Sequence, residues 1–358
     1  MFKHFRNTKY LFKVYGFKPI LLLVPIWRLF YHSLLWPCML YDEIFFPKYR
    51  KVRLEKPIFI IGHPRSGTTF LHRFLCNHSD EISGLKLKNM ILPSLTMQKF
   101  FGGIVEKNDH KTTGKLYEPE IHKTSAGSYE TDDAAIFFRF FSGMFSWIYF
   151  NSWKKYKSIN AMECELKSLM LKKKFIKHLK TLHKKNNLGK NRRIISKLFS
   201  IAIDPVILKD HFPDAKIIYM IRNPKDAIPS SISLVKSIQS KLFAFSKLEE
   251  KKQIEYYKNL YDSSRIFYKN ASELTNSRKT EDILFIHYYD LKDSFENTLQ
   301  LIMDYCDIKP DKKLIDAIEQ QKEKQKTYSG LHKYSCTDFG FEEEAIIHDF
   351  SKFYKFNS

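Results

Sequence analysis

The sequence predicts an α/β fold in which a central parallel sheet is flanked by helices, with a basic and apolar helical extension at the N-terminus. Two continuous apolar runs, at 57–61 and 216–221, show no polar alternation, which is typical of parallel strands covered on both faces. The first run leads into a glycine-bounded loop and then into an apolar helical pattern. Strand-like and helical segments alternate from there to residue 326, and this order implies right-handed crossovers within one parallel sheet.

The remaining elements are assigned from apolar periodicity and turn residues. Short apolar runs at 194–197 and 283–287 predict two more strands. Residues 84–125 look irregular because they contain a Gly-Gly pair and two prolines, and the tail at 330–358 is mixed. The aromatic segment 131–150 predicts a helix that is buried or faces a bound molecule. Further helices are expected at 68–77, 163–188, 205–212, 224–235, 247–273, 294–306 and 312–326.

We expect residues 1–52 to form the extension and residues 53–358 to form one domain. An apolar run starts at Ile20 behind several lysines and arginines, but prolines and charged residues interrupt it before it reaches the ~20 apolar residues of a spanning helix. No small-residue cleavage site of a signal peptide follows the run. Basic residues beside Trp27 and Trp36 fit a helix that lies on an anionic membrane surface, and packing on the domain is the alternative.

The formal net charge of +21 favours anionic partners, although lysine is scattered over nearly every segment. The densest basic stretch, at 172–193, is either a solvated helix face or a surface for an acidic molecule or lipid headgroups. The five cysteines form no CxxC pair and no disulfide framework, which favours reduced thiols and a cytoplasmic location, with or without peripheral attachment to a membrane. The histidines and cysteines lack the spacing of metal ligands, so we expect no metal cofactor.

The segment 62–69 has the glycine spacing of a P-loop, G-x-x-x-x-G-x-T, between a predicted strand and a predicted helix. Backbone N–H groups from Ser66 through Gly67 to Thr69, together with the helix dipole, would bind an anion. The hydroxyls of Ser66, Thr68 and Thr69 add further donors. The sequence therefore predicts a P-loop-like sheet that binds a phosphate-bearing nucleotide.

The charged groups of this loop separate two classes of nucleotide enzyme. Thr68 stands where nucleotide kinases and ATPases keep the lysine that, with Mg²⁺, offsets the charge of a triphosphate. Arg65 instead offers a cation that can contact two anionic oxygens at once. A phosphosulfate carries less charge on its transferred group, so hydroxyls, amides and one or two cations can hold it without metal. An ATP-dependent small-molecule kinase with an atypical P-loop is the alternative.

The run P-R-S-G-T-T, followed by F-L-H-R-F-L, resembles the 5′-phosphosulfate loop of sulfotransferases that use 3′-phosphoadenosine-5′-phosphosulfate (PAPS). The likeness is greatest to the broad, mostly bacterial family with an Arg-Ser-Gly-Thr-Thr core, and it implies PAPS as the donor, held by Arg65–Thr69. Arg222 and Ser230 follow the strand at 216–221 and resemble the family's 3′-phosphate motif, at the carboxyl edge where open sheets bind ligands. The segment F-I-H-Y-Y-D-L-K resembles the strand end where a tyrosine contacts adenine, which points to Tyr288; a core tyrosine is the alternative.

This resemblance implies an in-line displacement at sulfur, in which positioning and charge stabilisation dominate. Lys197, at the end of a predicted strand, matches a lysine that the family places near the bridging oxygen. Cytosolic sulfotransferases use a histidine as base two residues later, where this sequence has Phe199. The segment 128–133 keeps two acids of the related bacterial pattern, so we nominate Glu130 as first and Asp132 as second general base; helix capping is the alternative.

Other residues leave the acceptor and the proton path open. His63 and His72 flank the loop and are alternative proton carriers. The aromatic run from Phe137 to Phe150 indicates a hydrophobic acceptor or simply core packing. We expect the acceptor to be a hydroxyl or amine of a small molecule, lipid or glycan, and we expect no nucleic-acid partner because two ordered nucleotide motifs explain the chain better than charge alone. The tail at 331–340 resembles the family's C-terminal signature, and the oligomeric state stays open.

Overall fold

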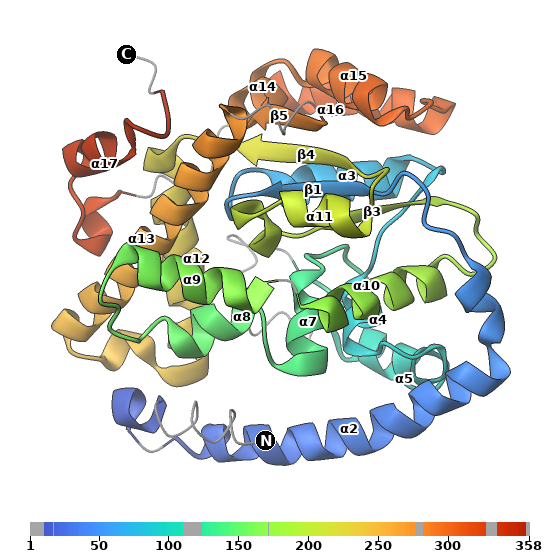
Figure 1. Ribbon diagram of the computed structural model, residues 1–358, viewed down its shortest axis with the longest axis horizontal. Helices are drawn as coiled ribbons and strands as arrows, with labels where there is room; N and C mark the ends of the chain where they lie inside the picture. Colours follow the sequence, from blue (N-terminus) through green and yellow to red (C-terminus); the bar gives the residue numbers. More distant parts are fainter. Residues whose placement is uncertain are drawn as a thin grey trace.

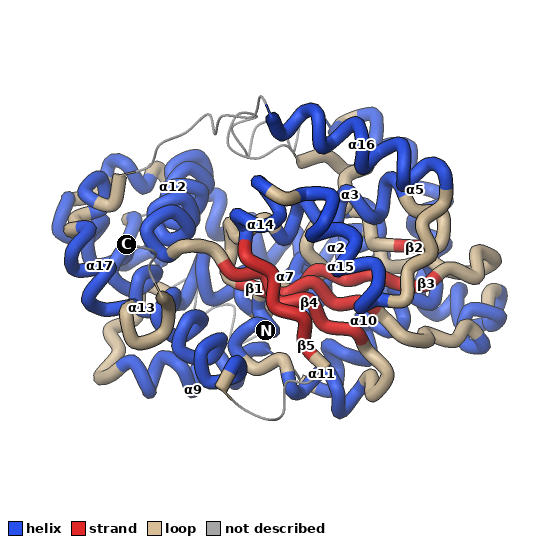
Figure 2. The backbone as a smooth tube through the Cα atoms, turned by 90° about the horizontal axis from the view of Figure 1, so that it is seen from above, coloured by secondary structure: helices blue, strands red, loops and turns tan. Residues whose placement is uncertain are grey.

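A five-stranded sheet forms the centre of the protein, with strand order β2-β3-β1-β4-β5 and every neighbouring pair parallel (Figures 1 and 2). The predicted fold class is confirmed, and only β2 is too short to be predicted from a pattern. The strands are β1 (Ile58–Gly62), β2 (Ile82–Ser83), β3 (Arg193–Lys197), β4 (Lys216–Ile221) and β5 (Ile283–His287). The computed structural model describes residues 11–16, 18–109, 124–170, 172–276, 282–326 and 335–355, so the first part of the predicted tail signature lies outside the described residues.

Both faces of the sheet are covered, which explains why its strands are apolar without alternation. Ile58 and Ile60 of β1 point into one core cluster, and Phe59 and Ile61 point into the other. The first cluster includes side chains of α3 (Thr68–His78), α15 (Phe295–Cys306) and α16 (Lys312–Lys326). Figure 1 shows α15 and α16 on one side of the sheet, and α7 (Asp133–Phe140) and α10 (Lys173–Asn186) on the other.

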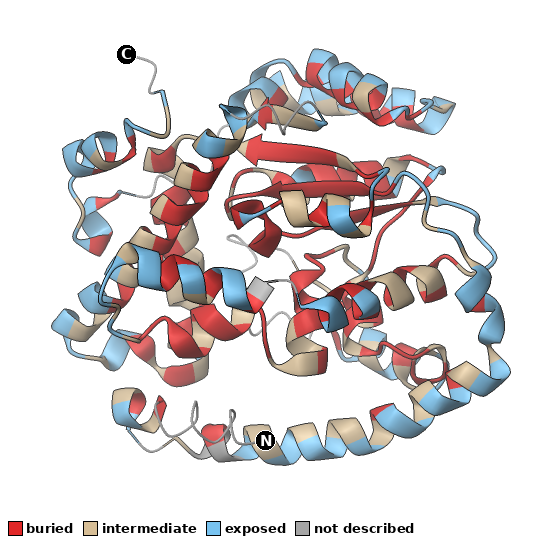
Figure 3. Cartoon of the chain, in the orientation of Figure 1, coloured by how far each residue is buried: buried red, intermediate tan, exposed pale blue. Residues whose placement is uncertain are grey.

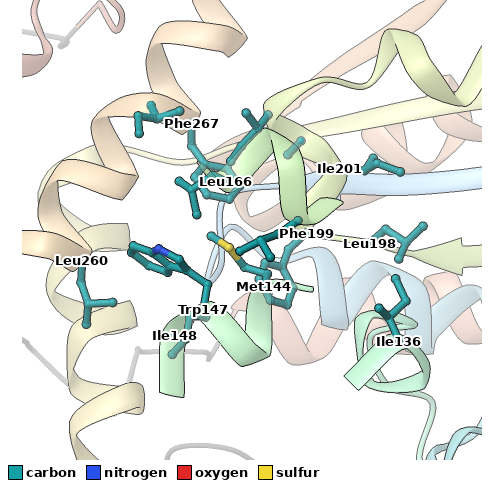
Figure 4. Close-up of a cluster of buried hydrophobic side chains, with 14 of the residues drawn as sticks. Ile136, Met144, Trp147, Ile148, Leu166, Leu198, Phe199, Ile201, Leu260 and Phe267 are labelled. Carbon is teal, nitrogen blue, oxygen red and sulfur yellow. The ribbon is translucent and has the colours of Figure 1, made fainter. Parts of the chain in front are cut away.

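The second cluster is larger and includes Trp147, Phe199 and Phe267, which are labelled in the close-up of Figure 4. The helices that contribute to it include α7 (Asp133–Phe140), α8 (Met144–Ser146), α9 (Ile159–Met170), α10 (Lys173–Asn186), α11 (Val206–His211), α12 (Pro224–Phe243), α13 (Glu250–Thr275) and α17 (Glu343–Phe350). The short elements that also contribute to it are the π-helix η2 (Trp147–Asn151) and the 3-10 helices η3 (Ser200–Ile203), η4 (Phe245–Lys247) and η6 (Thr337–Phe339). The short helix α14 (Tyr288–Asp293) follows β5, and its Leu291 belongs to the first cluster.

The segment that looked irregular in the sequence contains two helices, α4 (Leu87–Ile91) and α5 (Leu95–Lys107). Ser94 caps α5, because its hydroxyl accepts a hydrogen bond from the N–H of Met97 at 3.3 Å. The Gly-Gly pair lowers the helix propensity of α5, but packing of its apolar side chains outweighs that cost. Residues 110–123, in the same segment, are not among the described residues.

Two predicted helices are interrupted. The expected helix at 131–150 ends at Phe140, because Phe141 and Gly143 have left-handed backbones with φ of 49° and 80°. The chain resumes as α8 and continues into η2. The expected basic helix at 163–188 is two helices, since α9 ends at Met170 and α10 begins at Lys173.

The N-terminal extension contains one long helix, α2 (Pro19–Phe45), followed by η1 (Pro47–Lys51). Pro25 and Pro37, which interrupt the apolar run of the sequence, lie inside the helix and do not divide it, and Pro19 lies at its first turn. No helix in the described part of the chain is long and apolar enough to cross a membrane. The boundary of the domain at residue 53 stays a prediction.

Asp42 fastens α2 to the rest of the protein. Its carboxylate accepts hydrogen bonds from the N–H groups of Leu95 and Thr96, at 2.8 and 3.0 Å, and from the hydroxyl of Thr96 at 2.7 Å. Lys185 of α10 donates to the same carboxylate at 2.8 Å, and both side chains are buried. Burial raises the pKa of Asp42, but the hydrogen bonds from Lys185 and Thr96 outweigh it and hold the pKa below its usual value.

Because three of its histidines are buried, we expect the free energy of unfolding of the protein to fall in mild acid. Burial lowers the pKa of His63 and His72 to about 4 and that of His178 to about 3. Below the ordinary pKa near 6.5 the unfolded chain binds protons that the folded protein does not bind. The free energy of unfolding should therefore fall as the pH drops from 7 to 5, by roughly 1–2 kcal/mol for each imidazole.

Urea unfolding at pH 7 and pH 5 measures this loss. The His178→Gln variant should lose roughly 1–2 kcal/mol less between the two pH values than the wild type does. The matched change at the exposed His348 should leave the difference unchanged. An equal loss in wild type and His178→Gln would contradict the assignment of the acid sensitivity to buried imidazoles.

Candidate active site

The loop between β1 and α3 approaches β4 so closely that its glycines have no room for a side chain. A Cβ at Gly62, where φ is 146°, would lie 2.3 Å from the carbonyl oxygen of Met220. A Cβ at Gly67, where φ is 86°, would lie 3.0 Å from the ring of Tyr288. Arg65 also has a left-handed backbone, with φ of 72°, which costs a non-glycine residue on the order of 1 kcal/mol. Packing against β4 and Tyr288 therefore requires the glycine spacing of this loop.

The first turn of α3 presents hydrogen-bond donors to the loop. The N–H groups of Thr68 and Thr69 have no intrahelical acceptor because the helix begins there, and the N-cap residue Gly67 has no side chain that could accept from them. The hydroxyl of Ser66 is buried and has no hydrogen-bond partner among the described residues. Such a helix N-terminus binds anions through its N–H groups and its dipole. The residues of the loop thus fit a phosphate or sulfate group.

The second predicted corner, Arg222 with Ser230, lies directly against this loop. Nε of Arg65 donates to Oγ of Ser230 at 3.0 Å, and Nη1 of Arg222 donates to the carbonyl oxygen of Arg65 at 2.9 Å. The Arg222 guanidinium lies 4.3 Å from the ring centroid of Tyr288, and Tyr268 donates to the Arg222 carbonyl at 2.6 Å. Nε of Arg222 is buried without a partner in the described part of the chain, which fits a bound anion. The structure brings the two motifs and Tyr288 together at one edge of the sheet.

Lys197 ends β3 beside β1, where it pairs with Ile60. Its ammonium is buried and donates to the hydroxyl of Thr69 at 2.7 Å. Burial lowers the pKa of Lys197, and the nearby Glu130 carboxylate opposes that shift. The lysine therefore lies at the first turn of α3, next to the donors of the loop.

Glu130, the first nominated base, lies on the chain segment that precedes α7. Its Oε1 accepts a hydrogen bond from the Thr124 hydroxyl at 2.8 Å and pairs with the Arg73 guanidinium. Nε of Arg73 also donates to the carbonyl oxygen of Tyr129 at 3.0 Å. The carboxylate is buried, close to Lys197, and is held in place from two sides.

Asp132, the second nominated base, lies in different surroundings. It is fully buried and accepts hydrogen bonds from Nε2 of His183, at 2.8 Å, and from the Ser196 hydroxyl. It is the N-cap residue of α7, yet its side chain makes no capping bond. Its N–H donates to the carbonyl oxygen of Lys197 at 2.8 Å. These contacts fasten the end of β3 to α7 and α10.

Arg73, Thr124 and His183 are site residues that the sequence did not suggest. Arg73 follows Thr69 by four residues on α3, so the two side chains share one face of the helix, and that spacing was an available signal. His183 meets Asp132 across 51 residues of sequence, and no local pattern points to such a contact.

The two histidines that flank the loop are buried. Nε2 of His63 lies 2.9 Å from the Ser264 hydroxyl, and burial lowers the pKa of both His63 and His72 to about 4. Both imidazoles are therefore neutral and weakly basic near pH 7. Within the described ranges, no group of three or more His, Cys, Asp or Glu side chains is arranged to hold a metal ion.

Comparison with known proteins identifies the family. The sequence model of the sulfotransferase family matches residues 57–312, which include the loop, both basic motifs and Lys197. The chain belongs to the sulfotransferase family. The resemblance of the loop to this family is thereby confirmed, and the kinase alternative loses its basis. No curated protein matches the chain.

Solved sulfotransferase structures share the fold. Sulfotransferase STF9 from Mycobacterium avium has a TM-score of 0.68 and 16% sequence identity, over 88% of this chain and 80% of that one. Sulfotransferase STF1 from Mycobacterium tuberculosis has a TM-score of 0.56 and 16% identity, over 87% of this chain and 80% of that one. At such identity the likeness concerns the fold alone. The family identifies the protein as a transferase, and the shared fold shows that its sheet is P-loop-like.

Because Gly62 lies so close to β4, we expect a single added methyl group there to lower the stability of the protein strongly. Gly62→Ala places a Cβ against the Met220 carbonyl and should lower the free energy of unfolding of the sulfotransferase by about 3 kcal/mol or more. Gly103→Ala on α5 is the matched control, because nothing lies within 4 Å of its added Cβ, and it should stabilise the protein by up to about 1 kcal/mol. Urea unfolding of both variants measures the difference, and equal midpoints would contradict the close approach.

Proposed function

We propose that the protein transfers the sulfuryl group of PAPS to a hydroxyl or amine of a hydrophobic acceptor. The observation that carries this proposal is the junction of the two basic motifs, in which Arg65 contacts Ser230 and Arg222 contacts Arg65. Two separate anion-binding corners in contact suit a donor that carries anionic groups at both the 3′ and the 5′ position of one adenosine.

The residues divide between the two ends of the donor. The phosphosulfate would be held at the start of α3, where hydrogen-bond donors converge. These donors are the N–H groups of Ser66–Thr69, the hydroxyls of Ser66, Thr68 and Thr69, and the guanidinium of Arg65. Arg222 and Ser230 would hold the 3′-phosphate, and the unpartnered Nε of Arg222 supports this assignment. Tyr288 would contact adenine, because its ring already lies beside Gly67 and Arg222.

The transfer exchanges one bond at sulfur for another. The acceptor oxygen or nitrogen forms a bond to sulfur while the bond between sulfur and the bridging oxygen breaks, and adenosine 3′,5′-bisphosphate leaves with that electron pair. Lys197 and Arg65 would offset the charge that grows on the bridging oxygen. Lys197 suits this role because it is buried and contacts the Thr69 hydroxyl.

Glu130 would accept the proton that the acceptor loses. Its nearness to Lys197 supports this role, since it places the carboxylate at the reacting end of the site, where it would face the acceptor on the side of sulfur opposite the leaving oxygen. Asp132 is the second candidate, but its contacts with His183 and Ser196 favour a role in positioning β3. Arg73 and Thr124 would orient the Glu130 carboxylate.

A group of aromatic side chains near Lys197, in which Phe199 is buried and Phe137, Phe145 and Tyr149 are half-buried, supports a hydrophobic acceptor. Phe199 follows Lys197 by two residues, and its ring centroid lies 5.4 Å from that of Phe145. The ring centroid of Phe145 lies 6.1 Å from that of Phe137 and 6.0 Å from that of Tyr149. Phe199 also packs into the second core cluster beside Met144 and Trp147 (Figure 4), so the aromatic groups have a rigid base.

The basic stretch at 172–193 is less suited to bind an acidic acceptor than its composition suggests. Lys185 is buried against Asp42, and Lys180 donates to the carbonyl oxygen of His211 at 2.7 Å. These two lysines therefore contribute to the packing of α10.

Arg222→Ala tests the assignment of the 3′-phosphate corner. The variant should bind adenosine 3′,5′-bisphosphate about 10- to 100-fold more weakly than the wild type, because a charge-assisted hydrogen bond contributes about 1.5–3 kcal/mol. Its affinity for adenosine 5′-monophosphate, which lacks the 3′-phosphate, should change little. Titration calorimetry with both nucleotides measures the two affinities, and an unchanged affinity for the bisphosphate would count against the assignment.

Glu130→Gln tests the base. The variant should keep its affinity for adenosine 3′,5′-bisphosphate but lose about 10²- to 10⁴-fold in turnover, measured with labelled PAPS and a panel of hydrophobic alcohols, phenols and amines. Glu163→Gln on α9 is the matched control, since Glu163 is also a buried, ion-paired carboxylate but lies with Lys167 and Lys269. Normal turnover by Glu130→Gln would remove this residue as the base.

A further inference from the structure

One side of α2 is exposed and almost wholly apolar. Between Leu23 and Phe45, every exposed position except Ser33 carries an apolar or aromatic side chain, with Trp27 at 61% and Leu40 at 63% exposure. Figure 3 shows this exposed side along the edge of the protein. A helix that is apolar on all sides normally lies wholly within an apolar medium, and soluble proteins rarely expose such a continuous patch. We therefore expect a second apolar surface to cover the outer side of α2.

The inner side of α2 is already fixed to the protein. Leu35 packs with Leu92 and Met97 in a separate buried cluster. The hydroxyl of Tyr31 donates to the carbonyl oxygen of Ile91 at 2.9 Å, and Asp42 is held as described above. The helix cannot turn its outer side inward without breaking these contacts, so the exposed side chains are a constant feature of the fold.

The apolar surface extends onto the neighbouring helix α5. Phe100 and Ile104 of α5 are exposed, the first at 66%, while the other side of α5 packs on α2. We call the exposed side chains of α2 together with Phe100 and Ile104 the apolar face.

The charges around the apolar face are positive. Lys13 lies exposed before α2, Lys48 and Lys51 follow it, and Lys99 and Lys107 lie on α5. The acids of α2 and α5 are engaged, because Asp42 is buried against Lys185, Glu43 pairs with Arg50, and Glu106 pairs with Lys88 at 2.5 Å. Together with the net charge of +21, this border complements a negatively charged surface.

We propose that the apolar face docks the protein on an anionic phospholipid bilayer, with the axis of α2 in the plane of the membrane. Leucine, isoleucine and phenylalanine side chains would enter the acyl boundary, and Trp27, Trp36 and Tyr41 suit the level of the headgroups. The surrounding lysines would contact lipid phosphates. A second copy of the chain fits less well, because its equally positive border would be repelled.

Docking would bring the proposed acceptor region close to lipid. Arg28 of α2 donates to the carbonyl oxygen of Phe138 at 3.2 Å, and its guanidinium lies 5.0 Å from the ring of Phe141. Phe141 contacts Phe137, which belongs to the aromatic group beside Phe199 and Lys197. The docking itself does not depend on the proposed donor or acceptor, and its test requires no turnover.

Flotation of the full chain with vesicles tests the proposal. The wild type should float with phosphatidylcholine vesicles that contain phosphatidylglycerol, and less with vesicles of phosphatidylcholine alone. The double variant Phe30→Glu with Leu40→Glu should bind the anionic vesicles at least about tenfold more weakly, because it loses two exposed apolar side chains that would enter the bilayer and gains two negative charges. The other double variant, Leu301→Glu with Ile315→Glu, makes the same change at exposed positions of α15 and α16 and should bind as the wild type does. Figure 1 shows α15 and α16 on the opposite side of the sheet from α2.

Thermal unfolding and binding of adenosine 3′,5′-bisphosphate should be the same in both double variants, which shows that each is folded. Equal vesicle binding by the two double variants, or no binding by the wild type, would overturn the proposal. Equal binding to neutral and anionic vesicles would overturn its electrostatic part. A dimer of the wild type in sedimentation experiments that Phe30→Glu with Leu40→Glu converts to a monomer would show that the apolar face belongs to a contact between copies instead.

Discussion

The closeness of β1 and β4 at their carboxyl ends is the constraint on which the candidate site depends. The two strands pair in parallel until Gly62 lies opposite Met220, and there the Met220 carbonyl occupies the space that a side chain would need. The loop after β1 and the turn after β4 therefore leave the sheet in contact, and Arg222 reaches the backbone of Arg65 across 157 residues of sequence. One packing requirement thus explains why two distant basic motifs meet.

Each buried charged group in the site lies beside a group that offsets its charge. An isolated ammonium within the protein would be costly, and burial does lower the pKa of Lys197. Thr69 accepts a hydrogen bond from it, Glu130 lies near it, and Arg73 pairs with Glu130. In the transfer proposed above, a proton would leave the acceptor and charge would grow on the leaving oxygen, so a neighbouring cation and carboxylate would serve both changes. The network that makes burial tolerable thus has the charges that the proposed chemistry would need.

The sequence predicted the parts of the protein that depend on neighbours in the chain. Continuous apolar runs gave four of the strands, since a doubly covered strand needs no partner to be recognised. Contacts between distant segments leave no pattern in the local sequence. The helix α5 forms in spite of its glycine pair because α2 packs on it. His183 contacts Asp132 from another helix. The loop could be placed in advance because glycine is required by backbone geometry, whereas the partner of Glu130 depends on how α3 is turned.

The helix α2 shows why the sequence could not distinguish a packed helix from one that lies on a membrane. Its apolar residues surround the whole helix, so periodicity does not indicate which side is buried. Asp42 decides the orientation, because its carboxylate binds the first N–H groups of α5 and the ammonium of Lys185, and only one rotation of α2 permits both. A buried ion pair fixed in this way is expensive to break, so it holds the remaining apolar side outward. The same interaction that packs α2 on the protein therefore also creates the exposed surface that needs a second partner.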